Sequence, residues 1–196
     1  MKRVPRFEFR RLAPVLALAL LALASRCYLL TAPLLDYHSW RQADTAAIAR
    51  NYTTNGYQWL FPQVDWGGQT PGYVESEFPL YSFTLALLYG VFGAQAWVGR
   101  LLTALAGAVA VGALYELVRS AGGNRRAALY AGLALALMPF PLYFGRTVMP
   151  DTWMLATAIL ALWSFQRWLK HPSAASYAMA LVWGAIAPLA KTPNLL

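Results

Sequence analysis

A polar stretch near the N-terminus carries the residue types that acid–base and phosphate chemistry require. Two carboxylates, a histidine and an arginine lie close together there, namely Asp36, His38, Arg41 and Asp44. If this stretch is helical, Asp44 shares a face with Arg41, which lies one turn earlier. Asp44 is therefore a candidate general base or metal ligand, and an exposed ion pair with Arg41 is the alternative interpretation.

The neighbouring candidates also have structural alternatives. Asp36 follows an apolar segment and is either a second candidate acid or a solvated turn residue. His38 is either a ligand for phosphate or a metal ion, or a hydrogen-bonded structural residue. Farther along the chain, Glu75 and Glu77 add two carboxylates, which together with Asp44 would suit a hard divalent cation. The residues alone leave metal dependence open.

A second polar group lies in the C-terminal half of the chain. Arg146 is positioned to bind a phosphate with its guanidinium, or to extend to a membrane surface as a structural residue. Asp151 follows Pro150, so favourable placement at a helix N-terminus is the alternative to an active-site role. Lys191 follows an apolar run, where ionisable residues are functional candidates, although a lysine near a helix end also reaches the interface.

The composition is that of a membrane protein. Hydrophobic residues make up 59% of the chain and charged residues 12%, with a mean hydropathy of +0.43. The net charge of +8 comes from basic residues at the ends of apolar runs, a pattern typical of membrane topology signals. We therefore expect no nucleic-acid partner. The single cysteine, Cys27, excludes an internal disulfide framework.

The apolar runs predict an all-α, polytopic membrane helix bundle with a long outer loop over residues 34–96. Within that loop we predict two interfacial helices. One covers residues 79–92, which would rise only about 21 Å as a helix and so would not cross a hydrocarbon core of roughly 30 Å. The other interfacial helix is predicted over residues 42–52. The predicted spans are about 12–33, 97–118, 127–146, 152–169 and 177–196.

Charge predicts the orientation of this bundle. With the N-terminus in the cytoplasm, the basic turns between spans face the cytoplasm and six of the eight acids face outward. We therefore expect a multi-pass protein of the plasma (inner) membrane. A cleaved signal peptide is the alternative for the first apolar run, which is longer than a usual signal core. The chain ends without a polar tail, and we expect it to be the N-terminal part of a longer protein.

The order of several short motifs resembles the N-terminal part of GT-C class membrane glycosyltransferases, specifically glycosyltransferase family 39. This family includes protein O-mannosyltransferases and aminoarabinose transferases. The motifs, in chain order, are Ile48-Ala49-Arg50, Glu77-Phe78-Pro79-Leu80-Tyr81, Tyr89-Gly90-Val91-Phe92-Gly93 with Arg100 beyond, Arg146 with Pro150-Asp151, and Leu189-Ala190-Lys191. Each motif is weak alone, but their order and spacing are fairly specific.

The resemblance implies transfer of a sugar from a polyprenyl-phosphate carrier at the outer face of the membrane, usually with inversion at the anomeric carbon. Relatives open the first loop motif with Asp-Glu, where this chain has Arg41-Gln42. The acid role is therefore assigned to Asp44, with Asp36 as the alternative. Relatives also carry Lys-Pro-Pro-Leu where this chain has Glu77-Phe78-Pro79-Leu80, so Arg146 or Lys191 is expected to contact the carrier phosphate.

A non-enzymatic carrier or polyprenyl-lipid flippase is the alternative function. Such a protein should place ionisable residues inside its spans, whereas most of them here are predicted at span ends and in loops. The sequence also lacks a Gly-rich phosphate loop, a zinc-type histidine cluster and a Gly-x-Ser-x-Gly elbow. This distribution favours the glycosyltransferase, with the sugar and the acceptor left open.

Overall fold

The computed structural model describes residues 9–74 and 77–191, which form an all-α fold with one isolated antiparallel bridge between Gln63 and Tyr73. The predicted fold class is thus confirmed. The described helices are α1 (Phe9–Arg26), α2 (Ser39–Asn55), α3 (Leu80–Phe92), α4 (Ala96–Ser120), α5 (Arg125–Leu137), α6 (Pro139–Phe144), α7 (Asp151–Lys170) and α8 (Ala174–Ala190).

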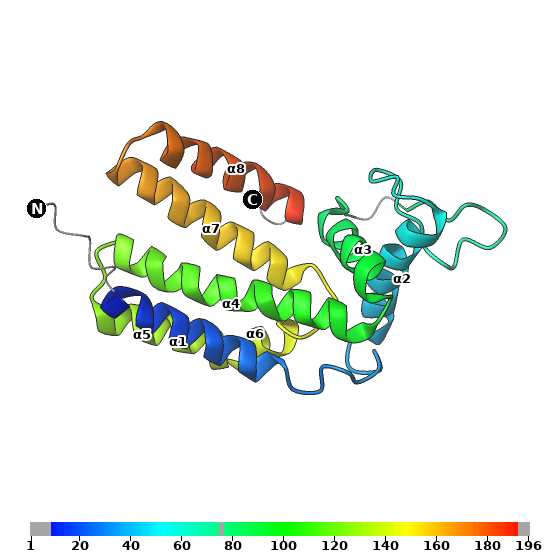
Figure 1. Cartoon of the computed structure of the whole chain (residues 1–196), viewed down its shortest axis with the longest axis horizontal. Coiled ribbons are helices and arrows are strands. Elements are labelled where there is room, and N and C mark those ends of the chain that lie inside the picture. The colour runs from blue at the N-terminus through cyan, green and yellow to red at the C-terminus, as the bar shows by residue number, and fades with distance from the viewer. Residues whose placement is uncertain (1–8, 75–76, 192–196) are drawn as a thin grey trace, which may run out of the picture.

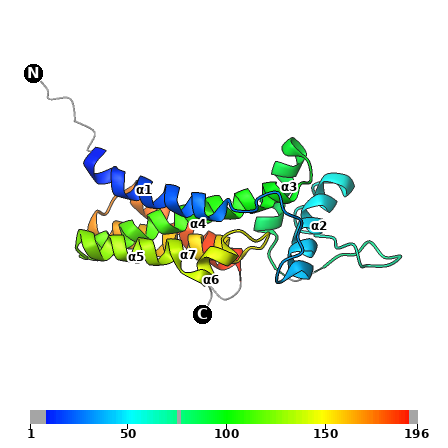
Figure 2. The same cartoon turned by 90° about the horizontal axis from the view of Figure 1, so that it is seen from below.

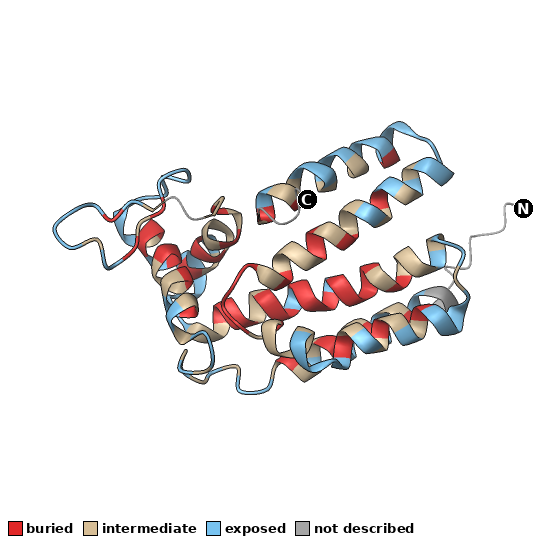
Figure 3. Ribbon diagram, turned by 180° about the vertical axis from the view of Figure 1, so that it is seen from behind, coloured by how far each residue is buried: buried red, intermediate tan, exposed pale blue. Residues whose placement is uncertain are grey.

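Helix α4 is the centre of the bundle. It lies between α1 with α5 on one side and α7 with α8 on the other (Figure 1). Its buried face is rich in small residues, including Ala104, Gly107, Ala110 and Gly112, which allow neighbouring helices to approach closely. Buried residues accordingly concentrate along α4, whereas α8 at the edge of the bundle is mostly exposed (Figure 3).

Within the described residues, α4 alone has both the length and the apolar composition to cross a membrane. A helix of its 25 residues rises about 37 Å, more than the roughly 30 Å of a hydrocarbon core. Three shorter apolar helical segments also occur, over Leu12–Arg26, Leu80–Phe92 and Ala174–Ala190. Length and composition therefore mark α4 as the strongest candidate span.

Two helices depart from the predicted spans. The first ends at Arg26 instead of extending to residue 33, and Leu29 beyond it adopts a left-handed backbone conformation with φ of 55°. The segment predicted over residues 127–146 is divided between α5 and α6 at Met138. Met138 is extended because it precedes Pro139, and a proline disfavours the helical conformation in the residue before it.

The buried guanidinium of Arg26 fastens α1 to this helix break. Its Nη1 atom donates to the carbonyl of Ala136 at 3.1 Å, and its Nη2 atom donates to Leu135 at 3.1 Å and Pro141 at 3.2 Å. The break leaves the Leu135 and Ala136 carbonyls without helical donors, and the arginine supplies donors for both. Gly145 lies so close to this guanidinium that a Cβ atom there would overlap it.

Helices α2 and α3 pack against each other at one end of the bundle (Figures 1 and 2). Their shared core contains Ile48 and Tyr52 from α2 and Tyr81 and Leu85 from α3. Both helices cover the residues for which interfacial helices are predicted. The structure therefore contains the two short helices of the predicted outer loop, and they lie beside the beginning of α4.

The loop after α2 is held to that helix by polar contacts. Arg50 donates to both carboxylate oxygens of Asp65 at 2.6 Å, and Asn51 donates to Asp65 at 3.0 Å. These hydrogen bonds from Arg50 and Asn51 lower the pKa of Asp65. The backbone N–H of Val64 donates to Gly72 at 2.8 Å, which closes the loop on itself.

Gly72→Ala should open this loop, whereas Gly68→Ala should have a smaller effect. Both glycines have positive φ, of 69° and 64°, but a Cβ on Gly72 would overlap the Val64 carbonyl while one on Gly68 would meet no atom within 4 Å. We expect a local cost of about 3 kcal/mol for Gly72→Ala and about 1 kcal/mol for Gly68→Ala. Limited proteolysis of the full-length protein measures the difference, and equal cleavage of the two variants would contradict it.

Candidate active site

Asp36 is the acid at which polar contacts from three other segments meet. Its Oδ1 atom accepts a hydrogen bond from Gln42 Nε2 at 2.6 Å. Its Oδ2 atom lies 3.4 Å from Nη2 of Arg146 and 3.8 Å from Nη2 of Arg100. Arg146 lies between α6 and α7, and Arg100 lies near the start of α4. The fold thus brings residues from distant parts of the chain to one carboxylate.

Gln42 positions this carboxylate relative to the turn before α7. Its side chain is fully buried, and its amide oxygen accepts the backbone N–H of Val148 at 3.1 Å. The same amide nitrogen that contacts Asp36 also lies 3.3 Å from the Tyr37 carbonyl. Gln42 therefore connects α2, the segment before it and the turn that carries Arg146.

Arg100 is a cluster member that sequence reasoning did not assign to the site. It is only 1% exposed, and it donates to the carbonyls of Leu29 at 2.5 Å and Pro33 at 3.1 Å. These bonds hold the segment between α1 and α2 against α4. Its position inside the predicted span 97–118 was the available signal, because an arginine buried in an apolar helix needs partners.

Asp151 and Lys191 form a second charged pair. Lys191 Nζ donates to Asp151 Oδ1 at 2.7 Å, and each side chain is 25% exposed. Asp151 begins α7 and Lys191 directly follows α8, so the pair joins neighbouring helices at their ends. Among the described residues, the buried Oδ2 atom of Asp151 has no hydrogen-bond partner. One carboxylate oxygen is therefore left for a further contact.

Among the described residues, the side chains of Asp44 and Arg41 make no ion pair or hydrogen bond with these two groups or with each other. Arg41 instead forms an ion pair with Glu77, the residue shortly before α3. Asp44 accepts a hydrogen bond from Trp66 Nε1 at 3.2 Å in the loop after α2. Glu75, the other acid predicted in this loop, lies outside the described residues. In the described part of the chain, no group of three His, Cys, Asp or Glu side chains could hold a metal ion.

His38 lies beside the Asp36 cluster in a packed aromatic environment. It precedes α2 in a left-handed conformation with φ of 62°, and its ring centroid lies 4.2 Å from that of Tyr37 and 5.7 Å from that of Phe144. Tyr143 also donates a hydrogen bond to the Tyr37 carbonyl. These contacts tie α6 to the start of α2.

An apolar cavity of about 240 Å³ lies beside Asp151, the acid of the Asp151–Lys191 pair. Its walls come from α1, α4, α5, α6 and α7, and its lining includes Gly107, Leu135, Phe144 and Leu155. Asp151 and Arg26 are the charged residues of this lining. The cavity therefore offers an apolar space to a ligand whose polar end could reach Asp151.

The charged groups gather at the end of the bundle that carries α2 and α3. Arg100 lies in the second turn of α4, and the beginning of α7 and the end of α8 approach α3 (Figure 1). A ligand bound there would meet acidic and basic groups at one end of α4 and apolar walls farther along it. Such an arrangement suits an amphipathic ligand with a polar end.

The comparisons identify the family of the chain. No curated protein and no solved structure matches it. Residues 75–196, more than half of the chain, match the family model described as dolichyl-phosphate-mannose-protein mannosyltransferase. This match includes Arg100, Arg146, Asp151 and Lys191. The chain therefore belongs to the dolichyl-phosphate-mannose-protein mannosyltransferase family, a group of GT-C membrane glycosyltransferases.

Proposed function

We propose that this protein transfers a sugar from a polyprenyl-phosphate carrier to an acceptor at the outer face of the membrane. The observation that carries the proposal is the meeting of Asp36 with Arg100 and Arg146 at one end of α4. The family match supports glycosyl transfer, and the nearby apolar cavity supports a lipid-linked donor. In this proposal the N-terminus is cytoplasmic and the α2–α3 end of the bundle faces outward.

Arg146 and Lys191 are proposed to bind the carrier phosphate. Arg146 is 18% exposed, so a ligand can reach it, and its Nε atom makes no hydrogen bond within the described part of the chain. Lys191 is 25% exposed and lies at the end of α8. Two cations there would stabilise the negative charge that develops on the leaving phosphate. They take the place of the lysine that relatives carry before α3.

The proposed base is Asp36 rather than Asp44. Relatives carry their acids at the positions of Arg41 and Gln42, and the Gln42 amide lies 2.6 Å from the Asp36 carboxylate. Asp36 is therefore hydrogen-bonded to Gln42, whose position holds an acid in relatives. Asp44 contacts the loop tryptophan Trp66 instead. We assign the acid role to Asp36 for this reason and keep Asp44 as the comparison.

In the proposed step, Asp36 accepts the proton of an acceptor hydroxyl as its oxygen attacks the anomeric carbon. The new bond joins that carbon to the acceptor oxygen, and the bond to the phosphate oxygen breaks. The carrier phosphate leaves with the bonding electron pair, and Arg146 and Lys191 stabilise its charge. Asp151 holds Lys191 in position through their 2.7 Å contact. Attack opposite the leaving group inverts the anomeric carbon.

Transfer of radiolabelled sugar from a polyprenyl-phosphate donor by the full-length protein in detergent tests the function. We expect Asp151→Asn to lower the rate about 100-fold, because Lys191 loses its anionic partner. Asp65→Asn serves as the control, because Asp65 lies in the loop after α2 and forms an exposed ion pair with Arg50. Unchanged transfer in both Asp36→Asn and Asp151→Asn would reject the site. Movement of the lipid-linked donor across a vesicle bilayer, without cleavage of its sugar–phosphate bond, would favour the carrier function instead.

A further inference from the structure

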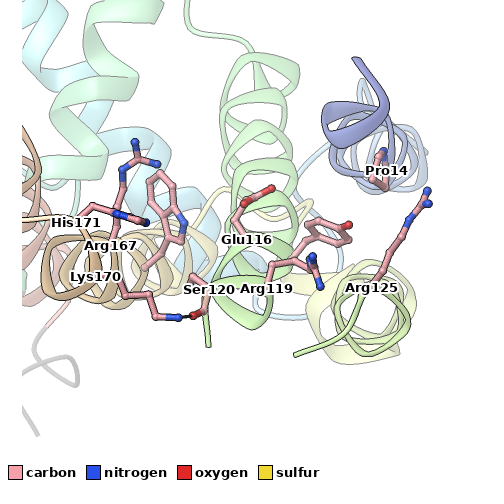
Figure 4. Close-up of a pocket in the computed structure, with 10 residues that line it drawn as sticks. Pro14, Glu116, Arg119, Ser120, Arg125, Arg167, Lys170 and His171 are labelled. Carbon is pink, nitrogen blue, oxygen red and sulfur yellow. Dashed lines mark hydrogen bonds between the residues drawn. The ribbon is translucent and has the colours of Figure 1, made fainter. Parts of the chain in front are cut away.

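A second and larger cavity, of about 590 Å³, lies at the other end of the bundle. It is formed where α4 and α7 end and α5 begins, with α1 alongside (Figure 4). Arg119 in this cavity is 19 residues beyond Arg100 on α4, a rise of about 28 Å. That rise is close to the roughly 30 Å of a hydrocarbon core, so a membrane-spanning α4 would place this cavity at the membrane surface opposite Asp36.

Positive charge converges on this cavity from three helices. Its charged lining consists of the four cations Arg119, Arg125, Arg167 and Lys170 and a single acid, Glu116. In the part of the chain that the structure describes, none of these five residues forms an ion pair. Four cations therefore face one acid in this cavity, and among the described residues no ion pair neutralises them.

Neutral groups nevertheless hold several of these cations in place. Arg119 donates to the Gly123 carbonyl at 2.8 Å, and Lys170 donates to the Ser120 carbonyl. The guanidinium of Arg167 lies over the ring of Trp163, with its carbon 5.8 Å from the ring centroid. These contacts orient the side chains but leave their charge in place, because carbonyls and an aromatic ring carry no net charge.

The lining of the cavity also contains apolar and aromatic side chains. Pro14 from α1, Tyr115 from α4 and Trp163 from α7 line it together with the cations. A ligand that fills this space thus meets cations at the end of the bundle and aromatic rings deeper in it. Phospholipids have this arrangement of an anionic phosphate and an apolar body, and basic pockets between membrane helices bind such headgroups.

We propose that this cavity binds the phosphate group of an anionic phospholipid. Inorganic phosphate has the same anionic group but lacks an apolar part that could contact Trp163 and Tyr115. The proposal does not depend on glycosyl transfer, since it concerns the membrane surface opposite the proposed active site. Bound lipid would link the ends of α4, α5 and α7 and so stabilise the folded bundle.

Adjacent arginines provide a matched test. Arg125 lines the cavity, whereas Arg126 does not, and both side chains are exposed at the start of α5. We expect Arg125→Gln to weaken phosphatidylglycerol binding about 5-fold, and Arg125→Gln combined with Arg167→Gln to weaken it about 30-fold. Arg126→Gln should change the affinity less than about 2-fold. Titration of the full-length protein in detergent, followed by native mass spectrometry, measures each affinity.

Two further ligands identify the source of the phosphate. Phosphatidylcholine should bind more weakly than phosphatidylglycerol at equal concentration, because its headgroup carries no net charge. Inorganic phosphate at the same concentration should not displace phosphatidylglycerol. Displacement by inorganic phosphate would reject a lipid ligand. Equal weakening in Arg125→Gln and Arg126→Gln would reject the cavity as the site, and thermal unfolding of each variant checks that the bundle remains folded.

Discussion

Asp36→Asn should lower the rate of sugar transfer about 1,000-fold, whereas Asp44→Asn should lower it less than about 10-fold. The two substitutions make the same chemical change within one short stretch of the chain. Asp36 contacts Gln42, Arg100 and Arg146, while in the described part of the chain the Asp44 carboxylate accepts a hydrogen bond from the Trp66 indole alone. The transfer assay with the full-length protein distinguishes the two acids, and the opposite order of rates would return the role to Asp44.

Asp36→Asn should also reduce stability, and the two effects can be separated. Arg100 is 1% exposed and loses its anionic neighbour, which we expect to cost about 2 kcal/mol after allowing for the partial exposure of Asp36. Asp65→Asn removes the partner of the exposed Arg50 and should cost less than about 1 kcal/mol. Unfolding in detergent measures both costs. A normal transfer rate in folded Asp36→Asn protein would assign Asp36 a structural role only.

Arg26→Ala should lower the free energy of unfolding by about 4 kcal/mol. Arg26 is 1% exposed and donates to carbonyls of Leu135, Ala136 and Pro141. The alanine variant leaves the Leu135 and Ala136 carbonyls without donors and also leaves a cavity, whereas the Pro141 carbonyl keeps the Gly145 N–H at 2.9 Å. Each lost bond to a charged donor costs about 1.5 to 3 kcal/mol. Arg126→Ala on the exposed start of α5 should change stability by less than about 0.5 kcal/mol.

Glycine variants around Arg26 provide an independent check of this contact. A Cβ on Gly145 would overlap the guanidinium and would also lie 2.7 Å from the Pro141 carbonyl, whereas one on Gly184 would meet no atom within 4 Å. Gly145→Ala should therefore displace Arg26 and destabilise the protein, while Gly184→Ala should not. Unfolding in detergent of both variants tests this difference, and equal stability would contradict the close approach of α1 to α6.

The helices themselves were largely predictable from the sequence. Long apolar runs fix the existence of α4 and α7, and Asn124 before α5 supplies the side chain that accepts the Ala127 N–H. The break at Met138 follows from Pro139, which disfavours a helical residue before it. Such signals are local, because each depends on residues within a few turns of the chain.

The contacts of the candidate site were less predictable because they join distant segments. The Arg146 contact with Asp36 spans 110 residues, and no local pattern specifies it. An ion pair of Arg41 with Asp44, the alternative interpretation of Asp44, suits an isolated helix, but Glu77 and Trp66 from the following segment supply other partners. Tertiary packing therefore decides which acids meet which cations.

The Arg26 contact has a consequence for the order of assembly during synthesis. The carbonyl of Ala136 lies 110 residues downstream of Arg26, and the chain grows at about 5 to 20 residues per second, so the partner is made roughly 5 to 20 s later. If α1 enters the membrane as soon as it emerges, Arg26 stays hydrated or in contact with lipid headgroups during this interval. The final packing of α1 therefore depends on the synthesis of α5 and α6.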